Sequence, residues 1–254
     1  MATPVVMVHG AFCGGWTFER FRTPFEAAGH QVIAPDLRGH AKGEKPYAVI
    51  GVSMADYAAD IAVLCESLSE PPVLIGHSMG GLVAQLVARR TPVEALVLLA
   101  PSPPWGVAGS SIEEAVTAFG VQMMGSFSSG ALEPDRSLMR LYSLDRLPEA
   151  EREAIIARLG RESGLAVRET LNWWLDPFMT TSVGAGVLNV PALVITGERD
   201  VVHSPSTARA TAQRIGAAFK SMPGMSHWLV GEAGWEAVAD LTLLWLAEEA
   251  LAAA

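Results

Sequence analysis

The fold of this chain is decided by residues 73–82, which read VLIGHSMGGL. Three apolar residues lead into a G-x-S-x-G pattern centred on Ser78, and an apolar helical segment follows directly. This arrangement is typical of a sharp strand-to-helix turn that holds a serine in a strained backbone conformation. Glycine at positions 76 and 80 lets the strand and the helix approach closely. The sequence therefore predicts that Ser78 is a nucleophile at the end of a strand.

Similar apolar runs recur along the chain with helical segments between them. Such alternation is typical of a parallel sheet that is covered on both faces. The predicted strands are residues 5–8, 31–34, 73–75, 96–99, 193–196 and 218–222. The predicted helices lie around residues 16–28, 53–68, 79–90, 205–215 and 234–251. The sequence therefore predicts an α/β fold with a mostly parallel sheet of about six strands flanked by helices. Together with the G-x-S-x-G turn, this arrangement resembles the α/β-hydrolase fold.

The stretch that follows the strand at 95–100 breaks this alternation, because it holds helical patterns but no convincing strand. It begins with three prolines in residues 101–104, which neither continue a strand nor start a helix easily. We therefore expect a core domain of residues 1–102 and 190–254, with a helical cap inserted at residues 103–189.

Partners for Ser78 occur in the order serine, acid, histidine, which this fold requires. His227 lies in a late loop, and a histidine can take the serine proton and return it to a leaving group. Asp200 follows a buried strand, from which a carboxylate can orient the imidazole. Asp36 is the main competitor for the acid, although it precedes the serine, and Glu198 is the fallback.

The chain has six histidines, and the other five have weaker claims to a catalytic role. His30 and His40 are predicted to lie on the surface. His203 is predicted to lie at the rim of the site, and it follows Asp200 too closely to be its charge partner in this fold. His9 and His77 are interpreted as structural residues that pack beside the site.

A glycine-rich loop follows the first strand at residues 9–16. Its glycines allow the backbone amide of Ala11 to turn toward the site, where it would form an oxyanion hole with the amide of Met79. Cys13 lies in the same loop, but nothing nearby would lower the pKa of its thiol, so we do not expect it to be a nucleophile. The residues predicted to line an apolar substrate pocket are Phe12, Met79, Trp105, Trp173, Trp174 and Trp228, with core packing as the alternative for the cap aromatics.

Composition excludes several other classes of protein. A net charge of -9, with 18 scattered basic residues, argues against a nucleic-acid partner. No apolar stretch reaches the roughly 20 residues that span a bilayer. Two cysteines are too few for a disulfide framework, so a cytoplasmic location is expected. The oligomeric state stays open between monomer and homodimer.

The chain resembles the α/β-hydrolase superfamily over nearly its whole length. Residues 8–16, 26–32 and 35–37 resemble the plant methylesterase and hydroxynitrile lyase group and its bacterial carboxylesterase relatives. The resemblance implies that the triad is Ser78, Asp200 and His227 and that the oxyanion donors are the Ala11 and Met79 amides. It also implies that no metal ion and no organic cofactor take part.

The expected activity is hydrolysis of small uncharged carboxylic esters through an acyl-enzyme on Ser78. Hydroxynitrile cleavage in the similar group uses a lysine after the catalytic histidine, whereas Trp228 follows His227 in this chain. Carbon–carbon bond hydrolases, lactonases and perhydrolases share the serine triad and stay open as alternatives. A ligand-binding receptor that keeps the scaffold is the alternative outside enzymes.

Overall fold

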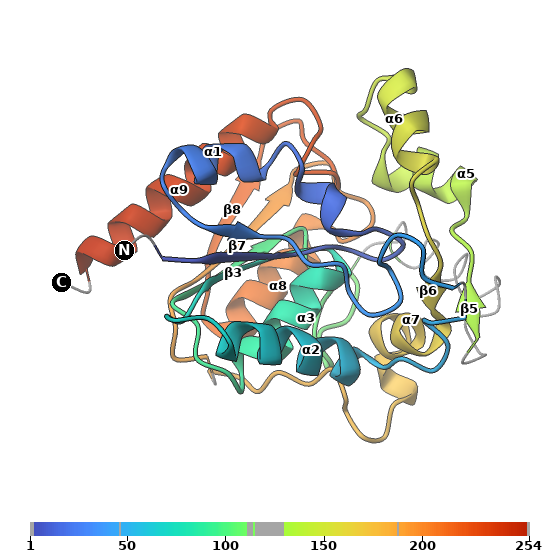
Figure 1. The fold of residues 1–254 in the computed structure, drawn as a ribbon, viewed down its shortest axis with the longest axis horizontal. Helices are drawn as coiled ribbons and strands as arrows, with labels where there is room; N and C mark the ends of the chain where they lie inside the picture. Colours follow the sequence, from blue (N-terminus) through green and yellow to red (C-terminus); the bar gives the residue numbers. More distant parts are fainter. Residues whose placement is uncertain (1–2, 46, 111–113, 115–129, 187, 253–254) are drawn as a thin grey trace.

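A single six-stranded sheet organises the molecule. The computed structural model describes residues 3–45, 47–110, 114, 130–186 and 188–252. The strands are parallel and lie in the order β2-β1-β3-β4-β7-β8 (Figure 1). They are β1 (Val5–Val8), β2 (Val32–Ile33), β3 (Val73–His77), β4 (Ala95–Leu99), β7 (Ala192–Gly197) and β8 (Ala218–Met222). The predicted mostly parallel sheet of six strands is confirmed.

Alternate residues along the central strands contribute to two apolar cores, one on each face of the sheet. In β1, Val6 and Val8 belong to one core, whereas Val5 and Met7 belong to the other. Successive side chains of a strand point to opposite faces. Because both faces are buried, the central strands are apolar at every position rather than at every second one.

Helices cover both faces of the sheet (Figure 1). One face packs against α2 (Met54–Glu66), α3 (Met79–Ala88) and α8 (Pro205–Ile215). The other packs against α1 (Arg22–Ala27) and α9 (Trp235–Ala252). None of the described helices is both long enough and apolar enough to cross a lipid bilayer.

The first predicted helix, residues 16–28, is divided in two. A short 3-10 helix, η1 (Gly15–Phe18), comes first, and α1 begins at Arg22. This break places Pro24 in the first turn of α1, where the missing N–H of proline costs no helical hydrogen bond. The sequence pattern thus predicted where the helical segment begins and ends, but not the break between η1 and α1.

Between β4 and β7 the chain leaves the sheet, and we call described residues 130–186 of this stretch the insert. Its elements are β5 (Ala131–Leu132), α5 (Arg136–Leu138), the π-helical turn η2 (Met139–Ser143), α6 (Glu149–Ile156), β6 (Glu162–Ser163), α7 (Gly164–Leu171) and η3 (Trp173–Leu175). The expectation of no strand here is wrong in one respect, because β5 and β6 form an antiparallel pair. Strands of two residues are too short to show a periodic pattern. Figure 1 shows α5, α6 and the β5–β6 pair at one end of the sheet.

Three central strands end side by side. In the parallel register His77 of β3 lies opposite Leu99 of β4, and Leu99 lies opposite Ile195 of β7. Residues that follow these strands therefore meet at the carboxyl edge of the sheet, where open parallel sheets place their sites.

Candidate active site

Ser78 occupies a strained turn between β3 and α3. Its backbone has φ 54° and ψ -123°, outside the regions that a non-glycine residue prefers. Its N–H donates to the carbonyl of Leu99 at 3.0 Å, which fixes the turn against β4. The strained conformation predicted from the G-x-S-x-G pattern is confirmed.

The glycines around Ser78 are required by space. A Cβ atom at Gly76 would lie 2.4 Å from the carbonyl oxygen of Gly80, and one at Gly80 would lie 2.2 Å from that of Val8. Neither contact is possible for a real side chain, so strand, turn and helix meet this closely only with glycine at both positions. The sequence prediction for these two glycines is also confirmed.

Ser78, His227 and Asp200 form a chain of hydrogen bonds. His227 Nε2 lies 3.0 Å from Ser78 Oγ, and His227 Nδ1 lies 2.9 Å from Asp200 Oδ2. Because a carboxylate only accepts, Nδ1 carries the proton and Nε2 is left to accept from the serine hydroxyl. The structure thus brings together the three side chains predicted from sequence, in the geometry of a general base and its orienting acid.

Asp200 is held as an anion in a buried position. Its Oδ1 accepts the backbone N–H groups of Val202 at 2.8 Å and His203 at 3.0 Å. Burial by itself would raise the pKa of this carboxyl, but the adjacent His227 and these hydrogen bonds outweigh burial and lower it. A fixed negative charge therefore faces His227, where it would stabilise a protonated imidazole.

Two other histidines surround His227 and stay neutral. The ring of His77 donates from Nε2 to the His227 carbonyl at 2.9 Å, and burial, with His227 adding to it, lowers its pKa to about 3. His203 lies 2.9 Å from Ser102 Oγ, and burial lowers its pKa to about 4. His77 has the packing role that the sequence indicated. His203 is buried against the site rather than placed at its rim.

Asp36 and Glu198, the two other candidates for the acid that orients His227, each accept a hydrogen bond from a loop backbone instead. Asp36 Oδ1 accepts the N–H of Gly15 at 2.7 Å and so braces the glycine-rich loop. Glu198 is exposed and accepts the N–H of Gly224 at 3.0 Å. Neither carboxylate contacts His227, so both have the non-catalytic positions that the sequence favoured.

The glycine-rich loop lies directly against the nucleophile. A Cβ atom at Gly10 would lie 3.0 Å from Ser78 Cβ, so the neighbouring Ala11 is beside the serine. Met79 begins α3 at the amide end of the helix dipole. Among the described residues we find no hydrogen-bond acceptor for the amides of Ala11 and Met79. Both amides therefore belong to segments next to Ser78, and their role as oxyanion donors stays a prediction.

His40 corrects one sequence expectation. It was expected on the surface, yet its side chain is only 1% exposed and its Nε2 lies 3.1 Å from Glu162 Oε2 in the insert. The ring of His9 lies against it, with ring centroids 5.1 Å apart. The surface interpretation fails because Glu162 is far away in sequence and no local pattern announces it.

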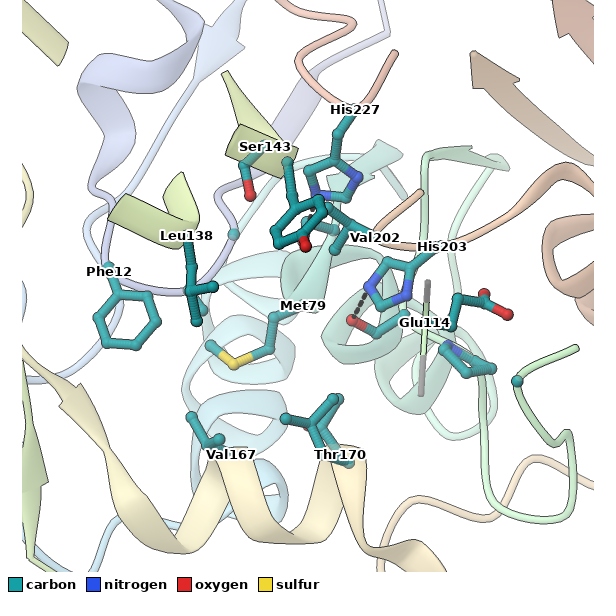
Figure 2. Close-up of a pocket in the computed structure, with 18 of the residues that line it drawn as sticks. Phe12, Met79, Glu114, Leu138, Ser143, Val167, Thr170, Val202, His203 and His227 are labelled. Carbon is teal, nitrogen blue, oxygen red and sulfur yellow. Dashed lines mark hydrogen bonds between the residues drawn. The ribbon is translucent and has the colours of Figure 1, made fainter. Parts of the chain in front are cut away.

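Ser78 and His227 line a cavity of about 510 Å³. Figure 2 shows this cavity with His227, Met79 and Phe12 labelled. Phe12, Trp173, Trp174 and Trp228 line it as predicted, together with Met79. Trp105 does not line the cavity, because its ring packs edge-on against Trp173, with centroids 5.2 Å apart. The burial of Cys13 raises the pKa of its thiol to about 12, which leaves it an unreactive part of the same wall.

The insert supplies wall residues that sequence reasoning missed. They are Asp135, Leu138, Met139, Tyr142, Ser143, Val167, Thr170 and Leu171. In Figure 2 Val167 and Thr170 point from one helix toward Met79, and Leu138 faces the same space. Spacing of three and four residues along α7 marks Val167, Thr170 and Leu171 as one helix face, but nothing in the sequence tells what that face covers.

Glu232 is a buried carboxyl that bonds to the loop carrying His227. Its Oε1 accepts the N–H of Ser226 at 2.7 Å, and burial raises the pKa of the carboxyl to about 7. A carboxyl with a raised folded-state pKa stabilises the fold most below its unfolded pKa of about 4.3 and loses this contribution as pH rises through about 7.

We therefore expect Glu232→Gln, which cannot ionise but still accepts from Ser226, to be more stable than the wild type at pH 8 by about 1–2 kcal/mol. The gain should fall to roughly a third of this value at pH 5, where the folded carboxyl is protonated but the unfolded one is still largely ionised. Urea denaturation of both proteins at the two pH values measures it. An equal difference at both values would show that ionisation of Glu232 has no part in stability.

Comparisons with known proteins agree with this geometry. Residues 5–241 match the family described as "Alpha/beta hydrolase family". Salicylic acid-binding protein 2 of Nicotiana tabacum is 37% identical over 110 residues, 42% of either chain, and the non-heme chloroperoxidase of Streptomyces lividans is 41% identical over 105 residues. These alignments span less than half of either relative, 42% and 37% of their lengths.

Solved structures resemble the whole chain. A pyrethroid hydrolase of Sphingobium faniae superposes with a TM-score of 0.73 at 22% identity, covering 97% of this chain and 98% of that one. An esterase of Thermogutta terrifontis superposes with a TM-score of 0.71 at 25% identity, covering 98% and 90%. The likeness therefore includes the sheet, the helices and the insert.

Proposed function

This chain belongs to the alpha/beta hydrolase family, and from that premise we propose that it is a serine esterase acting on small uncharged carboxylic esters. The observation that carries the proposal is the chain of hydrogen bonds Ser78–His227–Asp200 beneath a largely apolar cavity. Relatives named for ester hydrolysis support it, among them Arabidopsis thaliana methylesterase 3 and a carbendazim hydrolyzing esterase of a Nocardioides species.

In the proposed reaction Ser78 Oγ attacks the ester carbonyl while His227 Nε2 takes the hydroxyl proton. The carbonyl oxygen becomes an oxyanion that accepts hydrogen bonds from the Ala11 and Met79 amides. The tetrahedral intermediate collapses, His227 gives the proton to the leaving alkoxide, and an acyl-enzyme remains. Water, deprotonated by His227, then attacks the acyl carbonyl, and the acid is released as His227 returns the proton to Ser78 Oγ.

The wall of the cavity sets the substrate class. Its volume of about 510 Å³ suits a small ester, and aromatic and aliphatic side chains form most of it. No lysine or arginine lies among the described residues that line it, so an anionic acyl or alcohol group would lose its hydration without a lysine or arginine to pair with. We propose that the wall residues of the insert, which is part of the predicted cap, select among uncharged esters by shape.

A panel of p-nitrophenyl esters tests the proposal, combined with labelling by a fluorophosphonate and mass spectrometry of the labelled peptide. We expect turnover of short-chain esters and a single label on Ser78. Labelling without turnover of any ester would show that Ser78 is a reactive nucleophile in an enzyme of another activity, such as lactone or carbon–carbon bond hydrolysis. Neither labelling nor turnover would favour the receptor alternative and overturn the proposal.

Trp174 should set the preference for larger acyl groups. Trp174 is 57% exposed and lines the cavity, so Trp174→Ala removes apolar wall without opening the core. We expect KM for p-nitrophenyl butyrate to rise roughly 5- to 20-fold, an effect of about 1–2 kcal/mol, and KM for the acetate to change less. Phe178→Ala is the control, since Phe178 is 86% exposed and lies outside the cavity. Equal effects of both changes on KM would contradict the role of Trp174.

A further inference from the structure

Glu162 of the insert is buried completely and has four hydrogen-bond partners. Its Oε1 accepts the hydroxyl of Tyr57 at 2.7 Å and the N–H of Ser163 at 2.7 Å. Its Oε2 accepts the N–H of Phe12 at 3.2 Å and lies 3.1 Å from His40 Nε2. Each oxygen thus has two donors, which saturates the carboxylate. Three of these donors belong to the core, so one side chain of the insert joins three separate core segments.

Glu162 and His40 form a buried ion pair. His40 Nδ1 lies 3.2 Å from the carbonyl of Arg38, so both ring nitrogens face acceptors and both carry protons. Burial would lower the pKa of His40, but the charge of Glu162 and the hydrogen bonds outweigh it and raise the pKa. The pKa of Glu162 is lowered in turn, because His40 and its other donors outweigh burial. The carboxylate is therefore held as a fixed anion.

The segment that Glu162 holds is the glycine-rich loop of residues 9–16, which we call the oxyanion loop because Ala11 lies in it. Phe12 has φ 64°, a left-handed conformation that is uncommon for a non-glycine residue. Its N–H donates to Glu162, and its carbonyl accepts the N–H of Gly160 at 2.8 Å. Both backbone groups of this strained residue are therefore fixed by residues 160–162 of the insert. The N–H group that donates to Glu162 belongs to the peptide bond between Ala11 and Phe12. The orientation of Ala11 therefore depends on this hydrogen bond.

We propose that Glu162 is a positioning residue that keeps the Ala11 amide directed at the oxyanion by holding the next amide, that of Phe12. The inference rests on the proposed serine esterase function. Glu162 touches no reacting atom and acts only through the loop. It connects the insert, which forms the wall of the substrate cavity, with the donors that stabilise the transition state.

Glu169 provides a matched control for this arrangement. It also lies in the insert, and its Oε2 accepts a core backbone N–H, that of Met54, at 2.8 Å. Met54 begins α2 and is not part of the oxyanion loop. A change at Glu169 therefore removes the same kind of link between insert and core without touching Phe12. If Glu162 acts only as a link between insert and core, the two variants should behave alike.

The experiment compares Glu162→Ala and Glu169→Ala with the wild type, since alanine, unlike glutamine, leaves no oxygen to accept from Phe12 or from Met54. For Glu162→Ala we expect kcat on p-nitrophenyl acetate to fall roughly 10- to 100-fold with KM changed less than about 3-fold, because the loop acts on the transition state. The inhibition constant of a trifluoromethyl ketone, whose hemiketal places an oxyanion in the hole, should rise by a similar factor. Glu169→Ala should leave both constants within about 3-fold of the wild type. An unchanged kcat in Glu162→Ala, or equal losses in both variants, would overturn the inference.

Two further measurements decide the remaining cases. If Glu162→Ala does not fold, Glu162→Asp keeps a negative charge in the same place but is one methylene shorter, and it should lower kcat and weaken ketone binding in parallel; unchanged values would overturn the inference. If the wild type hydrolyses no ester, the proposed function fails by itself. Amide hydrogen exchange then decides the positioning role: the peptide containing residues 10–13 should exchange faster in the Glu162 variant than in the wild type and the Glu169 variant, and equal rates would overturn it.

Discussion

Replacing Ser78 by alanine is expected to lower kcat for p-nitrophenyl acetate by about 10⁴- to 10⁶-fold. The change deletes only Oγ, the atom that His227 Nε2 faces at 3.0 Å. Alanine keeps the same Cβ atom, so the strain of the turn at φ 54° is unchanged and the fold should be preserved. KM should change little, since the walls of the cavity and the oxyanion donors remain.

Residual turnover tests the nucleophile directly. The variant should bind a slowly hydrolysed ester as the wild type does but form no acyl-enzyme and take up no fluorophosphonate. Thermal unfolding of both proteins checks that the fold is intact. A variant that keeps more than about a tenth of the wild-type kcat would remove Ser78 from the mechanism and with it the proposed acyl-enzyme.

The sheet, and the three residues that meet at its edge, could be predicted from the sequence because their signals are local. Apolar runs such as Val5–Val8 are continuous, since each run is buried on both faces of the sheet. The pattern around Ser78 requires glycine at fixed spacing, because two backbones pass where a Cβ would stand. Asp200 and His227 each follow a strand, so the topology alone brings them to the edge where Ser78 lies.

The buried polar contacts between insert and core could not be read in this way. The pair His40 and Glu162 joins residues 122 positions apart, and each residue taken alone looks like an ordinary surface residue. The position of Trp105 behind Trp173 likewise depends on how the insert folds over the core. These features arise from tertiary packing, which leaves no periodicity in a single sequence.

Asp200→Asn is expected to lower kcat by about 10⁴-fold while the fold persists. The reason lies in the partners of Asp200. Its Oδ1 accepts the amides of Val202 and His203, so in the variant the amide oxygen must keep this position and the NH₂ group must face His227 Nδ1. A donor at that point makes Nδ1 an acceptor and moves the ring proton to Nε2. With a proton on Nε2, His227 cannot accept the hydrogen of Ser78, and the general base is lost.

Glu198→Gln is the matched control, because Glu198 is the nearby exposed carboxylate that sequence reasoning kept as a fallback acid. It bonds to Gly224 rather than to His227, so its loss should leave kcat within about 3-fold of the wild type. The rate of fluorophosphonate labelling should follow kcat in both variants, since it depends on the same activated hydroxyl. If Asp200→Asn is labelled at the wild-type rate, the ring proton stays on Nδ1 and the tautomer argument fails. If instead the Glu198 variant shows the larger loss, the acid of the triad has been assigned to the wrong residue.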